Sequence, residues 1–96
     1  LTRVHIPPNC RVVRLHLDPG TDAYRDYRAT LHDVSGVELW AQGQLQTANV
    51  QGGNAITLTF PCELLPEGDY HARLHGLSPG APPVRLRRYD FRVLRD

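Results

Sequence analysis

The stretch that decides the fold runs from residue 64 to residue 70 and reads Leu64-Leu65-Pro66-Glu67-Gly68-Asp69-Tyr70. Where a chain leaves one β-sheet for another, its backbone groups lose their ladder partners and need local ones. A tyrosine that packs its ring inward and turns its hydroxyl back to an upstream backbone group supplies such a partner. The spacing of Leu64, Pro66 and Tyr70 therefore predicts a tyrosine corner at a crossing between two sheets.

Alternation of apolar and polar residues predicts strands on both sides of this corner. Inward-facing apolar residues recur at every second position in five segments: 11–17, 27–32, 56–60, 70–75 and 89–93. Leu1 to Ile6 alternates as well and stops at Pro7-Pro8, which predicts a first strand at a sheet edge. Residues 37–50 are predicted as one strand that bulges or changes sheets at Gly43. The pattern predicts an all-β chain, an antiparallel immunoglobulin-like or fibronectin type III-like sandwich of seven or eight strands, with residues 1–96 as a single domain.

Size and charge narrow the function classes. The chain has 96 residues, 41% of them hydrophobic, and a formal net charge of only +1. Such a balanced charge gives no reason to expect nucleic acid or a membrane surface as the partner. No apolar run approaches the roughly 18 residues of a membrane span, so we expect no direct membrane insertion by this segment.

The two cysteines leave two outcomes open. Cys10 and Cys62 are 52 positions apart and match no CxxC spacing, which argues against zinc or dithiol chemistry. In the expected strand order both lie at the same end of one sheet, which favours a disulfide. The alternation of inward and outward positions argues against a disulfide, because Cys10 falls at an outward-facing position and Cys62 at an inward-facing one.

A basic face is the clearest candidate site. Outward positions on three neighbouring strands gather arginines and histidines, and we take the following as a candidate binding face: Arg28, His32, His71, Arg73, His75, Arg88 and Arg92. This face is either an ordinary solvated surface or a surface that binds an anionic partner. It carries no outward aromatic side chains for base stacking, which disfavours nucleic acid. An acidic protein, or another copy of this chain, is the expected partner.

The sequence gives little support for enzyme activity or metal binding. The two serines, Ser35 and Ser78, lie in predicted turns without an oriented base, so we expect no enzyme activity. Four residues along a strand separate His71 from His75 by about 13 Å, too far to hold one ion together. A neighbour pair of His32 and His71 is expected instead. Because two ligands make a weak site, we expect no metal and no cofactor.

Four segments carry a resemblance to a known family. They are Tyr27-Arg28-Ala29-Thr30-Leu31, Gly36-Val37-Glu38-Leu39-Trp40, Leu65-Pro66-Glu67-Gly68-Asp69-Tyr70 and Tyr89-Asp90-Phe91-Arg92-Val93. Their order resembles the extracytoplasmic sandwich of bacterial zinc-finger anti-sigma-factor-like envelope proteins. The resemblance implies the sandwich fold and a location outside the cytoplasm, in the periplasm or secreted.

Three functions are compatible with these observations. The first is a non-catalytic extracytoplasmic protein-interaction module of a bacterial envelope or secreted protein. The second is a subunit of an extracellular filament, whose strand Leu1 to Ile6 pairs with a neighbouring copy. The third is carbohydrate binding on a platform of Trp40, Tyr24 and Tyr27. Exposure of Trp40 and the pairing of the first strand separate the three.

Overall fold

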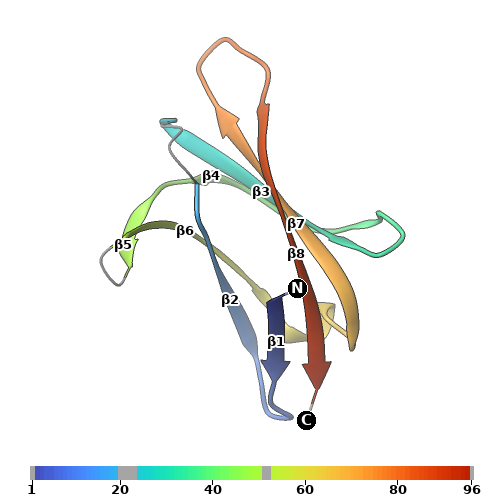
Figure 1. Cartoon of the computed structure of the whole chain (residues 1–96). Helices are drawn as coiled ribbons and strands as arrows, with labels where there is room; N and C mark the ends of the chain where they lie inside the picture. The colour runs from blue at the N-terminus through green and yellow to red at the C-terminus, as the bar shows by residue number, and fades with distance from the viewer. Residues whose placement is uncertain (1, 20–23, 51–52, 96) are drawn as a thin grey trace.

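The structure is a computed structural model that describes residues 2–19, 24–50 and 53–95. Within these residues eight strands and one short 3-10 helix follow one another along the chain (Figure 1). The elements are β1 (Thr2–Ile6), β2 (Val12–Leu17), β3 (Asp26–Asp33), β4 (Glu38–Leu45), β5 (Ala48–Val50), β6 (Gly53–Pro61), η1 (Cys62–Leu64), β7 (Gly68–Leu77) and β8 (Val84–Arg95). No helix in the described part of the chain is long and apolar enough to cross a membrane.

The strands form two sheets, which confirms the predicted all-β sandwich. One sheet has the order β1-β8-β7-β3-β4 and the other has the order β2-β6-β5. All neighbouring pairs are antiparallel except β1 and β8, which run parallel with Thr2 opposite Phe91. Antiparallel pairing therefore holds for every described pair except that of the first strand, which lies at the sheet edge as predicted. The turn at Pro7-Pro8 passes the chain from one sheet to the other, so β1 joins β8 instead of pairing with β2.

The predicted bent strand over residues 37–50 is two strands. β4 belongs to the five-stranded sheet and β5 pairs with β6 in the other sheet, so the expected change of sheets occurs. The change of sheets occurs after Leu45, while the predicted bulge is present at Gly43 and Gln44, where the β3–β4 register shifts by one residue. Gln44 has a φ of 56°, in the left-handed region that non-glycine residues seldom adopt, and this residue ends the regular part of β4.

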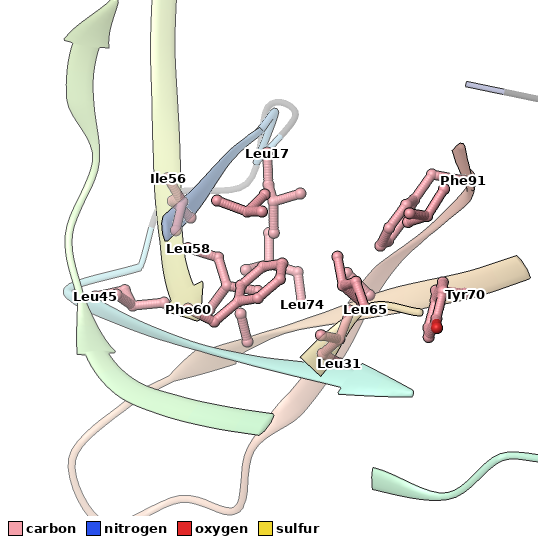
Figure 2. Close-up of a cluster of buried hydrophobic side chains, with 14 of the residues drawn as sticks. Leu17, Leu31, Leu45, Ile56, Leu58, Phe60, Leu65, Tyr70, Leu74 and Phe91 are labelled. Atoms are coloured by element: carbon pink, nitrogen blue, oxygen red, sulfur yellow. The ribbon is translucent and has the colours of Figure 1, made fainter. Parts of the chain in front are cut away.

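Alternating residues from both sheets fill one core. Tyr27, Ala29 and Leu31 from β3 are at most 2% exposed, as the sequence pattern predicts. Figure 2 shows Ile56, Leu58 and Phe60 of β6 in one cluster with Leu74 of β7. Burying each large apolar side chain contributes roughly 1.5–3 kcal/mol. Because these side chains alternate strictly, the polar residues between them must face outward.

The tyrosine corner is confirmed. The Tyr70 hydroxyl donates a hydrogen bond to the Pro66 carbonyl oxygen at 2.5 Å, and the Tyr70 ring stacks on Phe91 with centroids 5.8 Å apart. Leu64 ends η1 and packs half-buried against the core, while Leu65 is fully buried. The corner thus satisfies a backbone group where the chain crosses from β6 to β7.

A disulfide joins Cys10 to Cys62, with Cα atoms 6.0 Å apart. The parity argument against it is wrong because neither cysteine lies in a strand. Cys10 precedes β2, and Cys62 opens η1, directly after β6. Beside the bridge, the Arg95 guanidinium donates to the Cys62 and Leu65 carbonyl oxygens at 2.6 and 2.9 Å. These contacts add to the bond that the Cys62 carbonyl oxygen accepts from the Leu65 N–H, and they give the Leu65 carbonyl oxygen a partner beyond the end of the short helix.

Candidate functional site

The outer face of the five-stranded sheet holds the predicted binding residues in cross-strand rows. We name its two ends by their neighbours: the corner end, where β7 begins at the tyrosine corner, and the hairpin end, where β7 turns into β8 (Figure 1). From the hairpin end to the corner end the rows are Arg28–His75–Arg85, Thr30–Arg73–Arg88, His32–His71–Asp90 and Asp69–Arg92–Arg3. Residues in one row are direct neighbours on the same face of the sheet.

Two of the predicted arginines are paired with carboxylates, Arg92 in the row at the corner end and Arg88 across the two middle rows. Arg92 donates from Nε to Asp69 Oδ1 at 2.7 Å and from Nη2 to Asp69 Oδ2 at 3.3 Å. Arg88 donates from Nε to Asp90 Oδ1 at 2.9 Å. The Arg92 guanidinium lowers the pKa of the Asp69 carboxyl below its usual range. Arg88 and Arg92 therefore belong to the face as predicted, and each already has a carboxylate partner there.

The expectation that His32 and His71 are exposed is wrong. The two rings stack with centroids 4.9 Å apart and planes 7° from parallel, and the residues are only 8% and 6% exposed. The β3–β4 turn lies beside them, with His32 Nδ1 3.4 Å from the Gly36 carbonyl oxygen. His32 Nε2 lies 2.9 Å from the Thr30 hydroxyl. Burial, and next the Arg88 charge, lower the pKa of His71, which favours its neutral form.

The stacked pair confirms that His32 and His71 are neighbours, but its geometry does not suit a shared metal ion. A zinc ion binds an imidazole nitrogen at about 2.0–2.1 Å along the in-plane lone pair. Because the two planes are nearly parallel and stacked, an ion in the plane of one ring lies away from the plane of the other. No group of three or more His, Cys, Asp or Glu side chains suited to a metal occurs in residues 2–19, 24–50 and 53–95.

A rigid turn borders the stacked pair. Asp33 Oδ1 accepts hydrogen bonds from the backbone N–H groups of Ser35 and Val37 at 2.9 and 3.0 Å, and from the Ser35 hydroxyl at 2.8 Å. These bonds, the one from the Ser35 side chain first, lower the pKa of the Asp33 carboxyl. Val34 on this turn lines an open hollow of about 300 Å³ over His71 and Asp90.

The hairpin end differs because its cations have no carboxylate partners within the described part of the chain. Arg28 and Arg85 are exposed, Arg73 is half-exposed, and none of the three forms a salt bridge to a described residue. They surround His75, whose Nδ1 is buried without a hydrogen-bond partner. Burial lowers the pKa of His75, followed by the charges of Arg85, Arg28 and Arg73. We call these four residues, Arg28, Arg73, Arg85 and His75, the electropositive spot.

Arg85 is a site residue that the sequence pattern missed. Counting back in twos from Arg92, Asp90 and Arg88 places Leu86 on the outer face and Arg85 on the inner one. A register shift in the β7–β8 pairing breaks this alternation, because Leu74 lies opposite Arg87 while His75 lies opposite Arg85. Leu86 packs against the core, and Arg85 emerges beside His75. In the sequence, the only indication of such a bulge is an arginine placed directly before a leucine.

The two alternative functions, filament assembly and carbohydrate binding, depend on the first strand and on three aromatic rings. The structure places these features differently from what each function needs. β1 pairs along one edge with β8 of its own chain, so it is not available for exchange into a neighbouring copy, and its other edge is the edge of the five-stranded sheet. Tyr27 is 2% exposed and meets Tyr24 edge to face, with centroids 5.9 Å apart. Trp40 is half-buried against the core. These three rings do not form an exposed platform for a sugar.

Two packed, mainly antiparallel sheets with a tyrosine corner define an immunoglobulin-like β-sandwich. A solved structure with this fold is that of CopC from Methylosinus trichosporium OB3b, which is 19% identical to this chain at a TM-score of 0.53. The alignment covers 99% of this chain and 86% of CopC, so the likeness extends over the whole sandwich. No family model and no curated protein matches the chain. The resemblance to anti-sigma-factor-like envelope proteins gains no support from these comparisons.

Proposed function

We propose that this chain is a non-catalytic interaction module outside the cytoplasm that binds an acidic protein partner through the hairpin end of its outer face. One observation carries the proposal. On a sheet whose other outward arginines include two that are paired with aspartates, Arg28, Arg73 and Arg85 form no salt bridge to a described carboxylate. Grouped like charges repel one another in the free protein, and an acidic partner relieves that repulsion on binding.

The disulfide supports the location. Bridges such as Cys10–Cys62 persist in oxidising compartments and are rare in the cytosol, where thiols are kept reduced. The periplasm and the extracellular space meet this requirement equally, and either one agrees with a module of an envelope or secreted protein.

The chemistry of the spot favours protein over nucleic acid. No aromatic side chain lies among Arg28, Arg73, Arg85 and His75, so bases have no stacking surface there. The flat rows of arginine suit the carboxylates of an acidic segment, which can accept two parallel hydrogen bonds from each guanidinium. A second copy of the chain would have to offer carboxylates that are already paired or that lie at a sheet edge. A second copy is therefore the weaker candidate for the partner.

The test compares two double variants that lose the same net charge. Arg28→Gln with Arg85→Gln removes unpaired cations, and Arg88→Gln with Arg92→Gln removes paired ones. We expect the first to weaken binding of a short oligoglutamate peptide by about tenfold at low salt, because steering by exposed charge acts on this scale. The second should lose clearly less. Binding to the unchanged chain should also weaken as salt rises, since exposed charges are screened over about 8–10 Å.

Two results would overturn the proposal. Equal losses in both double variants would mean that only total charge matters and that the hairpin end is no site. Binding that is indifferent to salt would remove the electrostatic basis altogether. If the chain binds no oligoglutamate but self-associates in a manner that Arg28→Gln with Arg85→Gln abolishes, the partner is a second copy and the acidic partner is wrong.

Metal binding is the competing function. The adjacency of His32 and His71 and the unbonded Nε2 of His71 favour it, whereas the stacked geometry does not. One ring would have to rotate out of the stack for both to hold one ion. Cu²⁺ is the sharpest probe, because it binds nitrogen sites most tightly among the divalent first-row ions. Micromolar Cu²⁺ binding that His71→Gln abolishes and His5→Gln leaves intact would establish a metal role at this pair.

A further inference from the structure

His75 occupies an unusual place in the electropositive spot. It is half-buried, and its neighbours in the row are Arg28 on β3 and Arg85 on β8. Arg73 lies two positions before it on the same face of β7, opposite Thr30. His32 on β3 adds a weaker influence from the next rows. The charges that act on His75 come from these arginines and another imidazole. Asp26 on β3, opposite Leu77, is a carboxylate in the neighbouring row, and it forms no salt bridge to a described residue.

This arrangement opposes protonation of His75 in the free protein. A protonated imidazole has two N–H donors that need acceptors, yet the buried Nδ1 has no partner. The three guanidinium groups add like-charge repulsion. Both effects act in the same direction, so burial, followed by the charges of the arginines, lowers the pKa of His75 in the free protein below the ordinary histidine value.

An oxyanion placed among the three guanidinium groups reverses this balance. Its negative charge offsets the repulsion that the arginines exert on a charged imidazole, and its oxygens accept hydrogen bonds from the guanidinium and imidazole N–H groups. Linkage then requires that binding of the anion and uptake of a proton strengthen each other by the same factor.

We propose that Arg28, Arg73 and Arg85 bind a single oxyanion group, the carboxylate of an acidic partner, and that His75 takes up one proton as it binds. The inference rests on the proposed function, which it deepens by making partner binding proton-linked. No bond to the ligand is formed or broken. A proton passes from solvent to the imidazole, and the bound group remains an anion.

Sulfate is the probe for the first test because its charge does not change over the pH range in which histidine titrates. The experiment follows the imidazole signals of the unaltered chain by NMR from about pH 8 to about pH 5, on either side of the ordinary histidine value. Chloride and sulfate are compared at equal ionic strength. We expect His75 to titrate below the usual value in chloride and to shift upward in sulfate. Sulfate affinity should rise by about tenfold for each unit of that upward shift.

His5 is the internal control, because it is exposed on β1, away from the three arginines in the strand order. Its titration should be the same in both salts. The variant His75→Gln should bind sulfate with an affinity that no longer depends on pH, and Arg73→Gln should raise the titration point of His75 in chloride while reducing the response to sulfate. A circular dichroism spectrum of each variant checks that it is folded.

Sulfate that shifts His5 and His75 equally, or leaves His75 unmoved, would overturn the inference. Failure of the proposed function shows differently. If sulfate binding is proton-linked through His75 but oligoglutamate does not bind, the anion site exists and the acidic protein partner is wrong. If oligoglutamate binds through the arginines with no dependence on pH or on His75, the function stands and the proton linkage is wrong.

Discussion

Apolar and polar residues alternate in the same way at both ends of the five-stranded sheet, but the two ends differ in how their outward charges are paired. In the middle and corner-end rows two arginines meet carboxylates, in the pairs Arg88–Asp90 and Asp69–Arg92, while Arg3 forms no salt bridge to a described residue. At the hairpin end Arg28 and Arg85 flank a half-buried imidazole and have no carboxylate partner in the described structure. The contrast indicates a division of roles, in which the corner end stabilises the fold and the hairpin end is left available for binding.

The stabilising features also gather near the corner end. The Cys10–Cys62 bridge, the contacts of Arg95 with η1 and the tyrosine corner all lie where the chain crosses between sheets. Stabilising interactions and unpaired charges are thereby kept apart, so substitutions at one end should change stability and substitutions at the other should change binding.

The largest effect on stability should come from removing the disulfide. Cys10→Ala with Cys62→Ala opens a link that spans 52 positions, and cross-linking a loop of this length contributes about 4 kcal/mol by restricting the unfolded chain. Urea unfolding measures the loss, and the unaltered chain under reducing conditions should show the same decrease. A loss below about 1 kcal/mol would mean that the corner end does not depend on its bridge.

A second prediction separates the two ends directly. His71→Ala removes a buried ring stacked on His32 and should lower the free energy of unfolding by about 2 kcal/mol, a typical value for a substitution that opens a cavity. Arg85→Gln, at an exposed position of the hairpin end, should change stability by less than about 0.5 kcal/mol. Equal losses in urea unfolding would erase the distinction between the ends.

The tyrosine corner should contribute less than the bridge. Tyr70→Phe keeps the ring against Phe91 and removes only the hydroxyl that bonds the Pro66 carbonyl oxygen. The expected cost is about 1 to 2 kcal/mol, that of leaving a partly buried acceptor unsatisfied. Denaturant unfolding decides the point, with Tyr24→Phe as the control, since no hydrogen bond from its hydroxyl occurs among the described residues. No loss in Tyr70→Phe would show that the crossing is held by packing alone.

Acid should destabilise the chain modestly through one histidine at each end. The folded-state pKa values of His71 and His75 lie below the ordinary histidine value, with burial as the first cause. As pH falls below about 6.5 the unfolded chain binds protons that the folded chain does not, so stability decreases from there downward and is constant above. Thermal unfolding midpoints across this range measure the trend. The double variant His71→Gln with His75→Gln should have a flatter profile, and an unchanged profile would contradict the assignment.

Local signals were sufficient for the fold. The spacing of Leu64, Pro66 and Tyr70 predicted the corner because the device is built from residues close in sequence. Strict alternation predicted the core of β3, β6 and β7 for the same reason. The errors lie where a non-local or irregular feature intervenes. The parallel pairing of β1 depends on how the Pro7-Pro8 turn directs the chain, and no residue within β1 specifies it.

The candidate site was predicted only in outline. Alternation correctly placed Arg28, Arg73 and His75 on one face. It could not show that Arg92 meets Asp69, because that pair depends on the register between β7 and β8. It also could not show that the β3–β4 turn buries His32 and His71. Arg85 was missed because a single bulge reverses the parity of everything before it in β8.

The most direct measurement of the central claim maps oligoglutamate onto the sheet. Amide proton–nitrogen correlation spectra of the unaltered chain are recorded at low salt as the peptide is added, with an uncharged oligoglutamine as the control. We predict shifts concentrated around Arg28, Arg73, His75 and Arg85, little change near Asp69 and Arg92, and reversal when salt is raised. Shifts centred on the hollow beside Val34 and His71, or spread evenly over both ends, would contradict the account.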